Sequence, residues 1–130
     1  MRSLATFSLA VLLLGSGIIV STAGERHASA ELAESLCLGC PHGDANLTEP
    51  AQGGTNLTAR IRDLTPDAEY ELRWYSAAYC SGTATTIESF KGNSAGQATV
   101  NTHLDVTLDE VKSIGIVFQG EVQNCGTFVR

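Results

Sequence analysis

The feature that most constrains the fold is an alternation of apolar and polar residues that begins after Gly54. Leu57, Ala59 and Ile61 share one side of a predicted strand, and Thr58 and Arg60 lie on the other. The alternation recurs at 70–74 and 98–104, and further strands are predicted at 83–87, 114–118 and 127–129. Helical periodicity is nearly absent after residue 30, apart from one candidate turn at 31–40. These patterns predict an all-β protein.

The connections between the strands agree with this class of fold. Residues 63–67, Asp-Leu-Thr-Pro-Asp, are typical of a turn, because proline fixes φ and aspartate side chains bond nearby backbone amides. Residues 92–96 form a compact hairpin loop with a glycine at each end. Short strands at this spacing predict a small antiparallel Greek-key or Ig-like β-sandwich. Strand parity places Trp74 in its core and Tyr75 outward.

The first 30 residues predict a cleaved signal peptide. Arg2 precedes a short apolar run, and small residues of the A-x-A type end at Ala30, with Ala23 as the alternative end. The apolar run is interrupted by glycines and is shorter than a bilayer requires. We therefore expect a secreted, periplasmic or cell-surface protein, with residues 31–54 as an amino-terminal loop segment and 55–130 as the β-sandwich domain.

The charge of the chain limits its partners. From Glu31 onward there are 13 Asp and Glu residues against 6 Lys and Arg, a formal net charge of −7. Nucleic acid and anionic membranes both demand a positive surface, so neither is expected as a partner. No membrane span is expected after signal cleavage, and the predicted partner is an unknown extracellular or cell-envelope protein or ligand.

Four cysteines, Cys37, Cys40, Cys80 and Cys125, all follow the predicted leader. In an oxidising compartment an even number indicates two disulfides, although four cysteines allow three pairings. We favour Cys80 with Cys125, because both follow predicted strands and the bridge would close a long loop. That choice leaves Cys37 with Cys40 in a tight CxxC ring.

The sequence carries no clear catalytic or cofactor motif. Pro41 stands where a covalent haem site needs histidine, and no βαβ pattern supports a thioredoxin-like CxxC. Zinc or copper would need more histidines or cysteines at metal spacing, so His42 and His103 are only weak metal candidates and no cofactor is expected. The Asn-Leu-Thr sequons at Asn46 and Asn56 would matter only in a eukaryotic secretory pathway.

Several short motifs carry a resemblance. Leu64, Pro66 and Tyr70 form an L-x-P-x-x-x-Y pattern similar to the tyrosine-corner turn of fibronectin type III domains. In order along the chain, the 63–67 turn, Cys80-Ser-Gly82, the 93–98 hairpin, Ser113-Ile-Gly115 and Asn124-Cys-Gly126 resemble the Cu/Zn superoxide dismutase family. The resemblance covers roughly residues 55–130. It implies a Greek-key β-sandwich and supports the Cys80–Cys125 bridge.

The same resemblance implies that copper chemistry is missing. The family carries two copper-binding histidines on the strand after the turn, whereas this strand reads Tyr-Glu-Leu-Arg-Trp. We therefore expect a non-catalytic binding or structural module rather than an enzyme, with a degenerate dismutase-like metal-binding protein as the alternative. The predicted binding face consists of Arg60, Arg62, Arg73 and Tyr75, if their two strands pair, because arginine and tyrosine are enriched in interaction sites.

Overall fold

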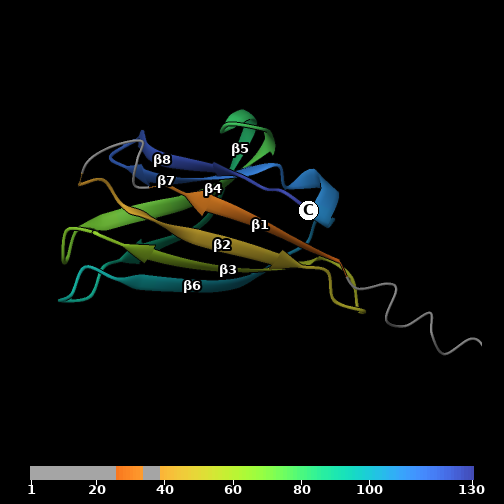
Figure 1. The fold of residues 1–130 in the computed structure, drawn as a ribbon, viewed down its shortest axis with the longest axis horizontal. Helices are drawn as coiled ribbons and strands as arrows, with labels where there is room; N and C mark the ends of the chain where they lie inside the picture. Colours follow the sequence, from red (N-terminus) through yellow and green to blue (C-terminus); the bar gives the residue numbers. More distant parts are fainter. Residues whose placement is uncertain (1–25, 34–38) are drawn as a thin grey trace, which may run out of the picture.

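The computed structural model describes residues 26–33 and 39–130, which form two four-stranded antiparallel sheets stacked face to face (Figure 1). The first sheet has the order β1-β2-β3-β6, with β1 (His27–Leu32), β2 (His42–Thr48), β3 (Thr55–Arg62) and β6 (Ala98–Leu104). The second has the order β5-β4-β7-β8, with β5 (Ser81–Lys91), β4 (Glu69–Ala77), β7 (Ser113–Phe118) and β8 (Glu121–Thr127). A single 3₁₀ turn, η4 (Leu108–Glu110), precedes β7. The predicted β-sandwich is confirmed.

The chain crosses between the sheets in Greek-key fashion. After β4 and β5 have formed part of the second sheet, β6 returns beside β3, and β7 then returns beside β4. The inward residues of both sheets make one core, whose largest fully buried members are Leu32, Leu47, Leu57, Ile61, Leu72, Leu108, Ile114 and Ile116. Within the described residues, no helix is long and apolar enough to cross a membrane.

The domain begins earlier in the sequence than predicted. Residues 27–30, assigned above to the leader, lie in β1, where Ala28 and Ala30 are buried in the core. Residues 42–48, assigned to a loop, form β2 between β1 and β3. A leader that ended at Ala30 would divide β1, whereas the alternative end at Ala23 leaves the strand whole.

β2 was missed because its composition is unusual for a strand. Its sequence, HGDANLT, is rich in residues that favour turns, yet Gly43, Ala45 and Leu47 alternate inward and are buried. Gly43 is required by close approach: a Cβ there would lie 1.9 Å from the carbonyl oxygen of Arg60. Pairing on both edges therefore overrides local preference in this strand.

Both connections that the sequence identified join strands of different sheets. The 63–67 turn links β3 to β4, and the 92–96 loop links β5 to β6. Because β5 and β6 belong to different sheets and do not pair, the 92–96 loop does not close a hairpin, in contrast to the prediction. The two loops contact each other, since the Leu64 N–H donates to the Gly96 carbonyl oxygen at 2.9 Å. The hydroxyl of Tyr70 accepts a hydrogen bond from the Thr65 N–H at 3.0 Å, within the L-x-P-x-x-x-Y segment.

Two details of the second sheet differ from prediction. Trp74 lies on the inner side, packed against the core, but it is only partly buried, and its partner on β5, Thr85, is exposed. The last strand lies at Glu121–Thr127 rather than at 127–129. Beyond it, Val129 exchanges backbone hydrogen bonds of 2.9 and 2.8 Å with Ser29 of β1. These bonds close one side of the sandwich.

Candidate functional site

The predicted binding face is wrong as a single surface. Arg60 and Arg62 lie on β3 in the first sheet, whereas Arg73 and Tyr75 lie on β4 in the second. The two strands do not pair, because the turn between them crosses from one sheet to the other. The arginines of β3 are exposed on the outer side of their own sheet. The four side chains therefore form two separate sets.

Tyr75 points outward from the sandwich, as predicted, but is only 5% exposed. Its ring lies over Gly115 together with the sulfur of Cys80, since a Cβ on Gly115 would be 3.1 Å from Tyr75 Cε2 and 3.2 Å from Cys80 Sγ. Cys80 is bonded to Cys125, which confirms this predicted disulfide. Tyr75 thus belongs to a small apolar cluster beneath the bridge and offers little surface to a ligand.

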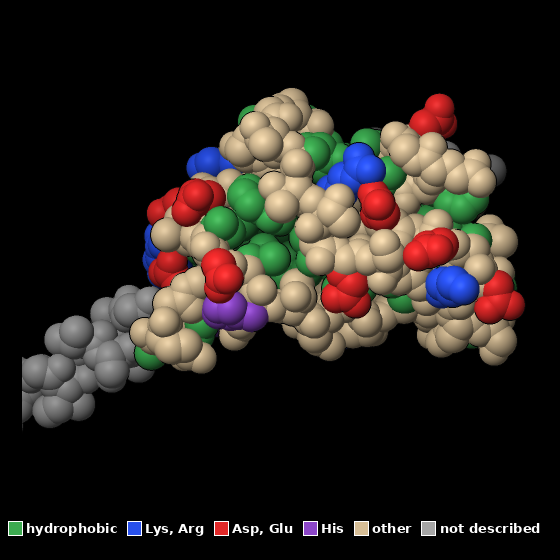
Figure 2. Space-filling view, turned by 180° about the vertical axis from the view of Figure 1, so that it is seen from behind, with side chains coloured by type: hydrophobic (Ala, Val, Ile, Leu, Met, Phe, Trp, Pro, Cys, Tyr) green, Lys and Arg blue, Asp and Glu red, His purple; other side chains and the backbone are tan. Residues whose placement is uncertain are grey.

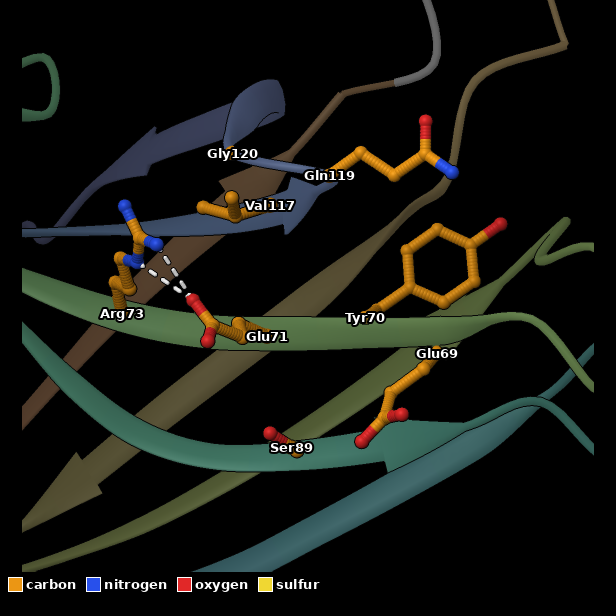
Figure 3. Close-up of a pocket in the computed structure, with 8 residues that line it drawn as sticks. All are labelled: Glu69, Tyr70, Glu71, Arg73, Ser89, Val117, Gln119 and Gly120. Atoms are coloured by element: carbon orange, nitrogen blue, oxygen red, sulfur yellow. Dashed lines mark hydrogen bonds and ion pairs between the residues drawn. The ribbon is translucent and has the colours of Figure 1, made fainter.

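Arg73 lies in a shallow polar pocket on the outer face of the second sheet (Figure 3). Its Nε and Nη2 both donate to Glu71 Oε1, the former at 2.9 Å and the latter at 2.6 Å. The pocket has a volume of about 280 Å³ and is otherwise lined by residues such as Glu69, Ser89 and Gln119. Because its only arginine is already paired, the pocket offers no free cation to an anionic ligand and is small for a drug-sized molecule.

The two weak metal candidates lie in separate surroundings. His42 Nδ1 is 3.5 Å from Asp63 Oδ2, and His103 Nδ1 is 2.7 Å from Asn56 Oδ1, with Asp105 near its other nitrogen. Within the part of the chain that the structure describes, no three His, Cys, Asp or Glu residues come together as a metal-binding group. The structure therefore places His42 and His103 on different strands, β2 and β6, and does not bring them together.

Two other sequence features have mixed outcomes. Cys40 is disulfide-bonded, but its predicted partner, Cys37, lies outside the described residues. The two sequons face each other across β2 and β3: Asn46 is opposite Thr58, Asn56 is opposite Thr48, and both asparagines are exposed. Their side chains are thus accessible on the outer side of the first sheet.

The most unusual exposed feature is the tip of the β4–β5 hairpin. Tyr79 is 83% exposed, the highest value among the exposed large hydrophobic residues of the described chain. Its φ is 60°, and that of Cys80 is 54°, so two successive non-glycine residues occupy the left-handed region. That conformation costs roughly 1–2 kcal/mol per residue. The fold therefore holds an aromatic side chain in water on a strained backbone.

The hairpin tip is fixed from several directions. Tyr79 N–H donates to Thr127 Oγ1 at 3.0 Å, and Cys80 N–H donates to Ser113 Oγ at 2.8 Å. On the hairpin itself, Ser81 Oγ–H donates to the Ala78 carbonyl oxygen at 2.6 Å. With the disulfide to β8, these bonds tie the tip to three strands. Tyr79 is thereby presented on a rigid support.

The strand that follows the tip is exposed along its whole length. Nine of the eleven residues of β5 are exposed, and only Ile87 and Phe90 are partly buried. β5 pairs with β4 along one edge and ends the sheet order, so its other edge has no strand partner among the described residues. Figure 1 shows the start of β5 extending beyond the stacked sheets. We call Ala78–Cys80 together with β5 the hairpin surface.

The hairpin surface was missed by the sequence reasoning. The Cys80-Ser-Gly82 segment was noted only for its cysteine, and alternation cannot show that a tyrosine adopts positive φ at a hairpin tip. One signal was present: an aromatic residue directly before a cysteine and a Ser-Gly pair, between two predicted strands. No family model matches the chain, and no curated protein matches its sequence.

Proposed function

We propose that the protein is an exported, disulfide-stabilised binding module whose hairpin surface engages an extracellular or cell-envelope partner without catalysis. The observation that carries this proposal is the exposure of Tyr79 on a strained, anchored backbone. Tyrosine supplies a large contact area with few rotatable bonds, and residues of this kind dominate binding energy at interfaces. A support that is already rigid reduces the entropy lost on binding.

Export is supported by the disulfide and the predicted leader. A bridge between Cys80 and Cys125 persists most readily in an oxidising compartment. We also propose a leader that ends near Ala23, because this end preserves β1 and keeps Arg26 with its partners. The mature chain would then carry the whole of the first sheet.

We further propose an architectural relationship to dismutase-like sandwiches that lack copper ligands. In its support, the matching motifs fall in order on the 63–67 turn, the hairpin tip, the 92–96 loop, β7 and β8. The strand that should carry copper ligands is β4, whose outward positions hold Glu69, Glu71, Arg73 and Tyr75. This relationship assigns no catalytic residue.

Site-specific photo-crosslinking in the exporting host tests the binding role. A photoreactive amino acid at Ser81, beside the tip, should yield a discrete adduct with another protein, and the Tyr79→Gly variant should reduce its yield at least about tenfold. The matched control places the same amino acid at Arg60, exposed on the other sheet. Equal adducts from both positions, or none from Ser81, would refute the proposal.

Metal analysis separates the alternative. Protein purified from the medium or periplasm without a histidine tag should contain copper and zinc well below one equivalent. Stoichiometric metal would favour the dismutase-like alternative over a metal-independent binding module.

In the crosslinking experiment, an adduct of twice the chain's own mass would identify a second copy of the chain rather than a foreign partner.

A further inference from the structure

The two long sides of the sandwich differ. On one side, the hydrogen bonds between Ser29 and Val129 connect β1 to the segment after β8. On the other side lie β5 and β6, the terminal strands of the two sheets. At one end of this side, backbone hydrogen bonds join the 63–67 turn to the 92–96 loop. There the Asp67 N–H donates to the Gly92 carbonyl oxygen, and the Leu64 N–H donates to the Gly96 carbonyl oxygen. Beyond this end, no backbone hydrogen bond joins β5 to β6 among the described residues, and we call this the open side.

Apolar surface is incompletely covered on the open side. Trp74, Ile87, Leu104 and Val106 pack against the core but remain partly exposed. The back of the molecule shows hydrophobic side chains in a surface hollow, bordered by acidic residues (Figure 2). An exposed hydrophobic patch beside an unpaired strand edge is the usual setting for strand addition.

The charge along β5 is different from that of the molecule as a whole. The protein has a formal net charge of −6, but β5 carries one acidic and one basic residue, Glu88 and Lys91, and has no charge from Ser81 to Ile87. Lysine, proline or a bulge often protects a free edge from pairing, and the first seven residues of β5 contain neither lysine nor proline. The strand does carry irregularities, because its register with β4 shifts between Glu88 and Thr86 and again between Ala84 and Ser81.

The sequence of β5 is compatible with pairing to itself. In an antiparallel pair centred on Thr86, Ser81 stands opposite Lys91 and Ala84 stands opposite Glu88. No like charges stand opposite each other, and Thr86 faces its own copy across the two-fold axis. Threonine pairs at such positions are favourable cross-strand neighbours.

We infer that two copies of this chain associate through antiparallel pairing of their β5 strands, so that two second sheets become one continuous eight-stranded sheet. The interface is isologous, since each copy contributes the same strand. It satisfies the free backbone groups of both edges. This inference concerns the β5 edge and does not depend on a foreign partner at Tyr79.

Charge substitution at the two-fold axis provides the test. Thr86→Lys and Thr86→Glu each place like charges opposite each other, so each variant alone should weaken dimerisation at least about tenfold. A mixture of the two should restore a dimer that contains one copy of each. Thr99→Lys, at an exposed threonine of β6 on the other sheet, is the matched control and should dimerise like the wild type.

Sedimentation velocity on the purified secreted protein measures the association, and thermal unfolding shows whether each variant is folded. A second measurement tests the register: Thr86→Cys should form an intermolecular disulfide on mild oxidation, because paired Cα atoms lie within disulfide range, whereas Thr99→Cys should not. A wild type that stays monomeric at about 100 µM, where even a weak micromolar dimer would form, overturns the inference. Dimerisation of the Thr86 charge variants that equals the control overturns it as well.

Discussion

At the scale of single residues, the structure separates side chains that stabilise the fold from one that does not. Tyr75 and Tyr70 are buried and bonded or packed within the domain. Tyr79 is exposed, and its side chain makes no hydrogen bond or ring contact with the described residues, while its backbone is strained. A residue kept at a cost in stability indicates selection for something other than folding.

Tyr79→Gly should therefore leave the protein as stable as the wild type, or more stable by about 1 kcal/mol, because glycine adopts positive φ without a Cβ clash. Equilibrium unfolding in urea measures this difference. Tyr75→Gly is the contrasting change, and it should destabilise the domain by about 3–5 kcal/mol through loss of a buried ring. A strong loss of stability in Tyr79→Gly would show instead that the tyrosine supports the fold.

Removal of the confirmed disulfide should have a large effect. The Cys80→Ser, Cys125→Ser double variant loses a bridge with a sequence separation of 45 residues, which the chain-entropy relation values at about 4 kcal/mol. A domain of this size has a total stability of roughly 5–15 kcal/mol, so a marked fall in the unfolding midpoint is expected. An unchanged midpoint would contradict a structural role for the bridge.

At the scale of elements, β1 changes the expected processing of the chain. β1 is the edge strand of the first sheet and pairs with β2 along six residues, and it contributes Ala28, Ala30 and Leu32 to the core. β1 also meets the segment after β8 through the Ser29–Val129 bonds. The strand therefore connects the first sheet to the segment that follows the second sheet.

The mature amino terminus should lie upstream of Arg26. Intact-mass analysis of the exported protein should give a chain that begins near Gly24, and a version made to begin there should fold. A version that begins at Glu31 should be less stable by several kcal/mol, since it loses two buried alanines and most of the β1 ladder. Equal stability of the two versions, or an exported chain that starts at Glu31, would show that β1 is dispensable.

The strands that sequence alone predicted share a clean period of two and β-branched or aromatic residues. β3, β4 and β6 satisfy both conditions, and their inward residues are those that the alternation selected. β1 and β2 use alanine, glycine, asparagine and aspartate, whose strand conformation depends on pairing with distant segments. The sequence also did not show that Arg60 and Arg73 lie on different sheets. Alternation indicates which face of a strand a residue occupies, but it does not indicate the sheet to which the strand belongs.

At the scale of the whole molecule, an ion network joins the residue before β1 to the carboxyl-terminal residue. Arg26 donates to Glu49 through Nε at 2.7 Å and through Nη2 at 2.9 Å, and its Nη1 donates to Asp109 Oδ2 at 3.1 Å. Arg130 Nη2 donates to Asp109 Oδ1 at 2.8 Å and to the Leu108 carbonyl oxygen at 3.1 Å. The network therefore links the starts of β1 and η4 to the carboxyl terminus.

These contacts make stability depend on pH in a defined direction. Hydrogen bonds from Arg26 lower the pKa of Glu49 below its usual 4.5, and those from Arg130 and then Arg26 lower the pKa of Asp109 below 3.8. A carboxylate whose folded pKa is depressed stabilises the fold above its unfolded pKa. This contribution is lost as the pH falls through the folded value. It is therefore complete above about pH 5 and declines in more acidic solution.

Arg26→Gln should flatten this dependence. In the wild type, the unfolding midpoint should fall between about pH 5 and pH 3, and part of that fall should disappear in the variant, because Glu49 and Asp109 then titrate closer to their unfolded values. Arg60→Gln makes the same charge change at an exposed position on β3 and should preserve the wild-type slope. Since the network is partly exposed, about 1 M salt should reduce the difference between wild type and Arg26→Gln. If the unfolding midpoints of all three proteins depended on pH in the same way at low salt, the network would contribute nothing to the stability of the fold.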